Sequence, residues 1–174
     1  YSGEVADSRV LCHGDLHPGS IMVNQEDGTV KIIDPEFTVY GPPGLDLGSL
    51  LSGFVLAAVH HAFSGAETSA AAVRSLRAGA AGIWGAYTDS MGAGGIAPAT
   101  VAKIGAEAVG FTVAEVCRTA LGFAGGRKWL QFGDEATKAA AVKCAMGIVQ
   151  RCMTGRHQGG MGVLFMELDA LASP

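Results

Sequence analysis

Three carboxylates near the start of the chain have the spacing of a site for phosphoryl transfer. Asp15 lies in "HGDLHPGS", where glycine and proline force a tight, irregular loop between two apolar runs. Asp34 and Glu36 flank Pro35 at the end of a later apolar run, and a proline there ends the hydrogen-bond ladder of a strand. We therefore expect all three acids to converge at one edge.

A convergent acid cluster is unfavourable unless a cation neutralises it, and hard oxygen ligands select Mg²⁺ or Mn²⁺. Such an ion binds polyphosphate, while one carboxylate orients and deprotonates an attacking hydroxyl. The hypothesis is phosphoryl transfer from a nucleotide. The alternative is a surface turn with capping acids, which would be favoured for "HGD" alone. The later "DPE" and "GLDLG", in this order, favour the catalytic interpretation.

The elements that must position these acids are a few short strands followed by helices. Apolar runs and turn residues predict strands at 9–12, 21–23 and 30–33, of which the last two form a hairpin. From Asp46 onward the apolar spacing predicts only helices, the last two at about 135–154 and 162–171. Breaks are expected at 63–68, 89–98 and 123–135, with "MGAGG" as a flexible connector. The predicted fold class is α+β and mostly helical.

Composition limits the function classes. The 174 residues are 49% hydrophobic and 16% charged, with a net charge of −4, which argues against disorder and against a nucleic-acid partner. The four cysteines lack metal-ligand spacing and indicate free thiols in a reducing, cytoplasmic compartment. Residues 47–66 carry no Asp, Glu, Lys or Arg, but their glycines, serines and two histidines predict a helix buried in protein, with no membrane contact.

The motifs "CHGDLHPGSIMV" and "VKIIDPEFTVYGPPGLDLG", with the later helices, resemble the C-terminal lobe of the aminoglycoside phosphotransferase-like kinases. Ser20 and the "DPEF" form look most like the S-methyl-5-thioribose kinase family within that protein-kinase-like superfamily. The resemblance implies that residues 1–174 are a C-terminal lobe whose short β-hairpin carries the site, with the N-terminal nucleotide-binding lobe absent. It also implies ATP and Mg²⁺ as cofactors, and phosphorylation of the anomeric hydroxyl of S-methyl-5-thioribose in methionine salvage.

Carried over by position, the resemblance makes Asp15 the catalytic base that binds the sugar hydroxyl and receives its proton. Asp34 and Glu36 become the magnesium ligands, and together with Pro35 they form the nucleotide-binding segment. Ser20 takes the place of an Asn that binds a second metal ion in most relatives, although its neutral hydroxyl is a weaker ligand.

Other residues are expected to support this site. His13 and His17 orient the loop, and Asp46 resembles the acid that hydrogen-bonds the catalytic-loop backbone in kinase folds. Arg118 matches one of two adjacent arginines that bind the sugar in the family, whereas Thr119 replaces the second. Loss of that guanidinium removes a planar donor set, so the reaction class is better supported than the acceptor.

Three alternatives stay open. Arg118 could be a surface cation paired with Glu115 or Glu107. The acceptor could be an aminoglycoside, choline or homoserine, and a cationic acceptor would need acids along the helical half: Glu107, Glu115, Asp134 and Glu135. The chain could also be a truncated, non-catalytic fragment with apolar surface left at the cleft. We expect the isolated chain to be inactive, and the resemblance alone suggests a homodimer.

Overall fold

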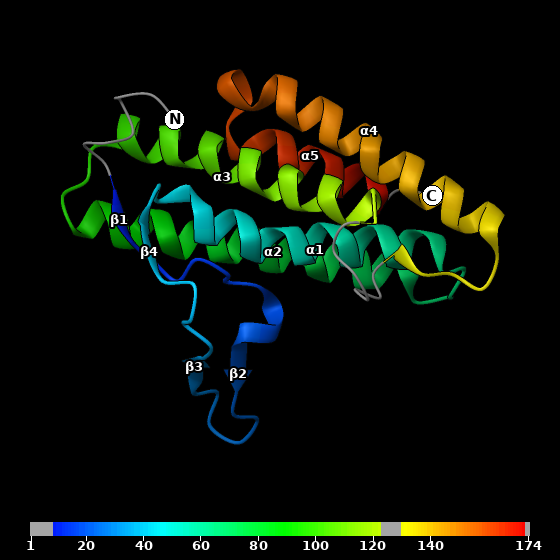
Figure 1. The fold of residues 1–174 in the computed structure, drawn as a ribbon, viewed down its shortest axis with the longest axis horizontal. Helices are drawn as coiled ribbons and strands as arrows, with labels where there is room; N and C mark the ends of the chain where they lie inside the picture. Colours follow the sequence, from blue (N-terminus) through cyan, green and yellow to red (C-terminus); the bar gives the residue numbers. More distant parts are fainter. Residues whose placement is uncertain (1–8, 123–129, 173–174) are drawn as a thin grey trace.

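The computed structural model describes residues 9–122 and 130–172, which form two small sheets and a bundle of long helices (Figure 1). The elements, in chain order, are β1 (Val10–Cys12), a 3₁₀ turn (Pro18–Ser20), β2 (Ile21–Val23), β3 (Val30–Ile32), β4 (Val39–Gly41), α1 (Gly44–Phe63), α2 (Ser69–Ala93), α3 (Pro98–Ala120), α4 (Glu135–Gly159) and α5 (Met161–Leu171). The predicted mostly helical α+β class is confirmed.

The predicted hairpin is present. Strands β2 and β3 are antiparallel, with Ile21 opposite Ile32, and the hairpin extends away from the helices (Figure 1). Strand β1 pairs instead with β4, which places Cys12 opposite Val39. The strands predicted from the sequence did not include β4. Strand β4 has three residues, and its partner lies some thirty positions away, so no local periodicity marks it.

Helix α1 is the centre of the molecule and contacts each of the other four helices. Twelve of its 20 residues are buried, and Leu51, Val55 and Leu56 are among the largest fully buried side chains. By length and composition α1 is the one helix in the described part of the chain that could cross a membrane. Its side chains form the protein core, so the prediction of a buried helix is confirmed.

Helices α1 and α3 pack in parallel through glycine. Gly44 lies against Ala108, and Gly48, one turn further along α1, lies against Phe111, one turn further along α3. A Cβ on Gly48 would overlap the Cβ of Phe111. Glycine therefore permits a closer approach of the two helix backbones than any other residue would.

Two helix boundaries differ from the prediction. Helix α2 continues through Met91 to Ala93, so part of the expected "MGAGG" connector is helical and the break shortens to 94–97. Helix α4 extends beyond 154 and ends at Gly160, whose φ of 53° is a left-handed value that favours glycine. Most of the third expected break, 123–129, lies outside the described residues.

The four cysteines are free, as predicted. Cys12 in β1 and Cys152 in α4 are buried, whereas Cys117 and Cys144 are half-buried. Burial raises the pKa of the Cys152 thiol to about 12. Burial also raises the pKa of Cys12, with a further contribution from the nearby charge of Asp46.

Candidate functional site

The loop that carries Asp15 connects β1 to β2 and is fixed to the first turn of α1. The two carboxylate oxygens of Asp46 accept hydrogen bonds from the backbone N–H of His13, at 2.6 Å, and of Gly14, at 2.9 Å. A bidentate carboxylate on successive amides orients both peptide planes. The residue directly before Asp15 is thus held by the helix bundle, which gives Asp46 the loop-bracing position expected from the sequence.

The His13 ring joins this loop to the second acid motif. Its Nδ1 lies 3.4 Å from the backbone N of Asp15, and its Nε2 lies 2.9 Å from the carbonyl oxygen of Ile33. Both contacts are satisfied when Nε2 carries the proton and Nδ1 accepts. His13 therefore connects Asp15 to the residue that immediately precedes Asp34.

Asp15 itself is half-buried and has two further contacts in its loop. Its Oδ2 lies 3.9 Å from Nε2 of His17, whose Nδ1 accepts the backbone N–H of Gly19 at 2.9 Å. The hydroxyl of Ser20 donates to the backbone carbonyl of Asp15 at 3.1 Å and is almost fully buried. In this arrangement Ser20 stabilises the loop, a use of its hydroxyl that the sequence analysis did not foresee.

The second acid motif follows β3 in an unusual backbone conformation. Asp34 has a positive φ of 67°. Among the described residues 9–122 and 130–172, no other residue except glycine has a positive φ. The carbonyl of Pro35 accepts hydrogen bonds from both the backbone N–H and the hydroxyl of Thr38, which closes a tight turn around Glu36. Asp34 and Glu36 are both exposed at this turn.

The two motifs also touch through their backbones. Gly14 has a φ of 88°, and a Cβ there would overlap the carbonyl oxygen of Phe37. Only glycine combines this left-handed conformation with such close contact. The Asp15 loop and the segment that follows Asp34 are therefore adjacent.

The expected convergence of all three acids is not found. Within residues 9–122 and 130–172, no group of three or more His, Cys, Asp or Glu side chains is placed to hold a metal ion. Every residue from 22 to 40 is exposed, so Asp34 and Glu36 lie at the surface. The donor set nevertheless fits Mg²⁺, which binds through one or two carboxylates completed by water and phosphate oxygens.

Arg118, near the C-terminal end of α3, forms an ion pair. Its guanidinium donates to Glu115, with the shortest contact 2.7 Å from Nη2 to Oε2. Hydrogen bonding to Glu115 raises the pKa of Arg118, and the charge of Asp15 adds to this effect. The pairing with Glu115 anticipated in the sequence is present, and Arg118 also lies within electrostatic range of Asp15.

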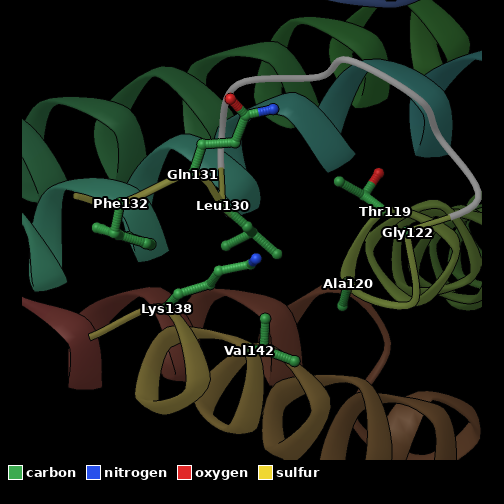
Figure 2. Close-up of a pocket in the computed structure, with 8 residues that line it drawn as sticks. All are labelled: Thr119, Ala120, Gly122, Leu130, Gln131, Phe132, Lys138 and Val142. Carbon is green, nitrogen blue, oxygen red and sulfur yellow. The ribbon is translucent and has the colours of Figure 1, made fainter. Parts of the chain in front are cut away.

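Thr119 occupies different surroundings from Arg118. Its side chain is buried and lines a pocket of about 360 Å³, together with Phe132 and Lys138 (Figure 2). Its hydroxyl has no hydrogen-bond partner among the described residues. The hydroxyl of Thr119 is therefore buried, whereas the guanidinium of its neighbour Arg118 is exposed.

The acids that a cationic acceptor would require are already engaged. The hydrogen bonds and ion pairs join Glu107 to the Gly44 N–H, Glu115 to Arg118, Asp134 to the Thr137 N–H and Glu135 to Lys138. The Thr137 amide lowers the pKa of Asp134, as expected at a helix N-cap. Of the four, Glu115 and Glu135 are paired with cations, whereas Glu107 and Asp134 accept neutral amide N–H groups.

Comparison with known proteins agrees with the motifs. Residues 4–86 match the model of the phosphotransferase enzyme family (APH). A segment of the chain is 50% identical over 50 residues to methylthioribose kinase 1 of Oryza sativa subsp. japonica. Similar segments match methylthioribose kinase of Geobacillus kaustophilus, at 47% over 55 residues, and of Escherichia coli O45:K1, at 45% over 53 residues.

These alignments are local. They cover 29% to 32% of this chain and 11% to 13% of the length of the three relatives. All three of these relatives are methylthioribose kinases, one from a plant and two from bacteria. The resemblance predicted from the motifs is confirmed: residues 4–86 match the phosphotransferase family model, and the chain is similar to methylthioribose kinases.

Proposed function

We propose that this chain is the C-terminal lobe of a cytoplasmic, ATP-dependent kinase that phosphorylates the anomeric hydroxyl of S-methyl-5-thioribose in methionine salvage. The observation that carries the proposal is the double attachment of the Asp15 loop. Asp46 fixes its backbone to α1, and His13 connects it to the residue before Asp34. The similarity to methylthioribose kinases supports the choice of acceptor.

Asp15 acts in this proposal as the general base. A carboxylate held on a braced loop, yet half exposed, can accept a hydrogen bond from the acceptor hydroxyl and then its proton. Its position is restrained on both sides, because His13 receives the Asp15 N–H and Ser20 donates to the Asp15 carbonyl. Arg118 would supply a guanidinium for the sugar, and Glu115 keeps that guanidinium oriented.

Asp34 and Glu36 would hold Mg²⁺, and with Pro35 they would form the edge where the nucleotide phosphates bind. The ion, when bound, neutralises charge on the transferring phosphoryl group. The left-handed backbone of Asp34 supports a functional assignment, because such conformations cost on the order of 1 kcal/mol and collect at functional sites. Ser20 is better assigned to the loop than to a metal, since its buried hydroxyl already donates to Asp15.

The neutral sugar is favoured over cationic acceptors. Choline and aminoglycosides are cations, and two of the four acidic candidates on the helices, Glu115 and Glu135, are already paired with Arg118 and Lys138. A cationic ligand would have to compete with these existing ion pairs. A neutral polyol requires no such exchange.

The exposed apolar surface favours a chain that works with a further lobe. Large apolar side chains on β1 to β4 remain open to solvent, among them Leu11, Met22 and Tyr40. Exposed apolar area of this kind marks a surface that another polypeptide or ligand covers. We therefore expect the isolated chain to show little or no phosphoryl transfer.

The test is phosphorylation of S-methyl-5-thioribose by the intact kinase, with choline and an aminoglycoside as comparison acceptors. Asp15→Asn should lower kcat by about 100-fold or more, because a general base contributes 10²–10⁴. The matched control is Asp27→Asn in the exposed hairpin turn, where the carboxylate only accepts the N–H of Thr29. Activity of Asp15→Asn within about tenfold of the wild type would refute the base assignment, and preference for choline would refute the acceptor.

A further inference from the structure

We infer that Glu107, on α3, is a positioning residue for the Asp15 loop, acting through the first turn of α1. The inference rests on the proposed function, because it concerns the same loop. From the sequence, Glu107 was a candidate for lining a cationic-acceptor site or for pairing with Arg118, whose guanidinium pairs with Glu115. Its Oε2 accepts a hydrogen bond from the Gly44 N–H at 2.8 Å, across 63 positions of sequence.

The first link is the N-terminus of α1. The first N–H groups of a helix have no partner within the helix and need an acceptor. Pro43, the residue before the helix, has no side-chain acceptor to offer. Glu107 supplies the missing acceptor from another helix, and its negative charge lies at the positive end of the α1 dipole.

The second link is steric. A Cβ on Gly44 would lie 2.7 Å from the backbone N of Ala108 and 2.9 Å from Oε2 of Glu107, so this end of α1 is pressed directly against α3. At Gly48 the helices are equally close. At these two contacts α1 has no room to move closer to α3, and the Glu107 hydrogen bond to the Gly44 N–H opposes its moving away.

The third link is Asp46, which lies between Gly44 and Gly48 on α1. Its carboxylate accepts the N–H groups of His13 and Gly14, directly before Asp15. These bonds stay linear only while the first turn of α1 keeps its position, because hydrogen bonds weaken steeply with angle. Glu107 therefore acts on the loop without touching it.

Charge near the strand supports the same path. Burial contributes most to the raised pKa of Cys12, and the charges of Asp46 and Glu107 add to it. The Cys12 thiol lies 3.5 Å from the carbonyl oxygen of Pro42, just before α1. The strand that leads into the loop therefore contacts the chain just before the helix that holds the loop.

The test is amide hydrogen exchange of the 174-residue chain, read residue by residue by NMR. Glu107→Ala should raise the exchange rates of the His13 and Gly14 amides by about tenfold, while buried amides of α4 such as Ile148 keep theirs. Glu107→Gln retains an acceptor oxygen and should restore most of the protection. Lys103→Ala, on the exposed surface of the same helix, is the matched control and should change neither set.

Asp46→Ala removes both hydrogen bonds to the loop, so its increase in the exchange rates of the His13 and Gly14 amides is the maximum against which Glu107→Ala is compared. Faster exchange confined to Gly44 in Glu107→Ala would mean that Glu107 only caps α1, and it would overturn the inference. A uniform increase that includes Ile148 would overturn it as well, since it reports global destabilisation. The exchange measurement needs no activity, so failure of the proposed kinase function would appear separately, as absent phosphorylation with loop protection intact.

Discussion

The helical body, α1 to α5, and the β segment, residues 10–41, are built in opposite ways. The body buries its large apolar side chains almost completely, as at Leu51 and Leu56. The β segment exposes most of its own: Val10, Leu11, Met22, Val23, Val30, Ile32, Ile33, Phe37, Val39 and Tyr40. Two-stranded sheets are marginal in water by themselves. The candidate site therefore lies on the less self-sufficient region, which depends on the body for its position.

That dependence is visible in a few contacts. Pro18 packs against Gly53 of α1, where a Cβ would overlap the proline ring. Asp46 holds the His13 and Gly14 amides from the same helix. A site can thus be well placed even where the sheet that carries it buries little, provided that its loop is bonded to a packed helix.

The largest expected difference between the two regions is in the free energy of unfolding that is lost when a leucine is replaced by alanine. Leu56→Ala in α1 should lower the free energy of unfolding by about 2–5 kcal/mol, because it leaves a cavity around a side chain with 0% exposure. The matched variant Leu11→Ala, at a side chain 66% exposed, should change it by no more than about 0.5 kcal/mol. Urea denaturation followed by circular dichroism measures both. Equal losses would show that the β segment is packed as tightly as the body.

A second comparison uses two buried thiols. Cys12 in β1 and Cys152 in α4 are nearly inaccessible, and burial raises the pKa of each. Alkylation therefore requires local opening, which takes less free energy in a two-stranded sheet than in a helix bundle. At pH 8, iodoacetamide should modify Cys12 about tenfold or more faster than Cys152. Mass spectrometry of digested protein locates the label, and earlier modification of Cys152 would reverse the order of stability.

The smallest expected effect is on the pH dependence of stability, through the Cys152 thiol in the helical body. A free thiol titrates near pH 8.5 in an unfolded chain, whereas Cys152 in the folded protein has a pKa of about 12. Above about pH 8.5 the unfolded state loses a proton that the folded state keeps, so stability falls as the pH rises toward 12. The urea midpoint should decrease from pH 8 to pH 10, and less so in Cys152→Ala. Identical slopes for the two proteins would exclude Cys152 as the cause.

The predictability of the fold differs between the same two regions. Apolar spacing located the helices, and the uncharged run at 47–66 was correctly taken as a buried helix up to residue 63, because burial inside a bundle selects that composition, whereas residues 64–66 are exposed beyond its end. Strand β4 could not be predicted, since its pairing with β1 joins distant positions. The continuation of α2 through Gly92 was missed because a single glycine only weakens a helix, by about 1 kcal/mol.

For the site, residue types were easier to predict than their arrangement. The motif order singled out Asp15, Asp34 and Glu36, but the convergence of their carboxylates depends on side-chain directions that spacing does not determine, and it is not found. The Ser20 bond to Asp15 and the Glu107 bond to Gly44 carried no sequence signal, because each replaces a more obvious partner. A glutamate that caps another helix from 63 positions away has no recognisable sequence pattern.

The contact between Gly14 and Phe37 has a consequence for how sequences of this kind can change over time. Because the two acid motifs meet there backbone to backbone, their separation does not depend on the turn at residues 24–29 that connects β2 to β3. Insertions and deletions can accumulate in that turn while the two motifs stay in place. Gly14 has no such freedom, so a lineage can lengthen or shorten its hairpin but cannot exchange this glycine without moving one motif away from the other.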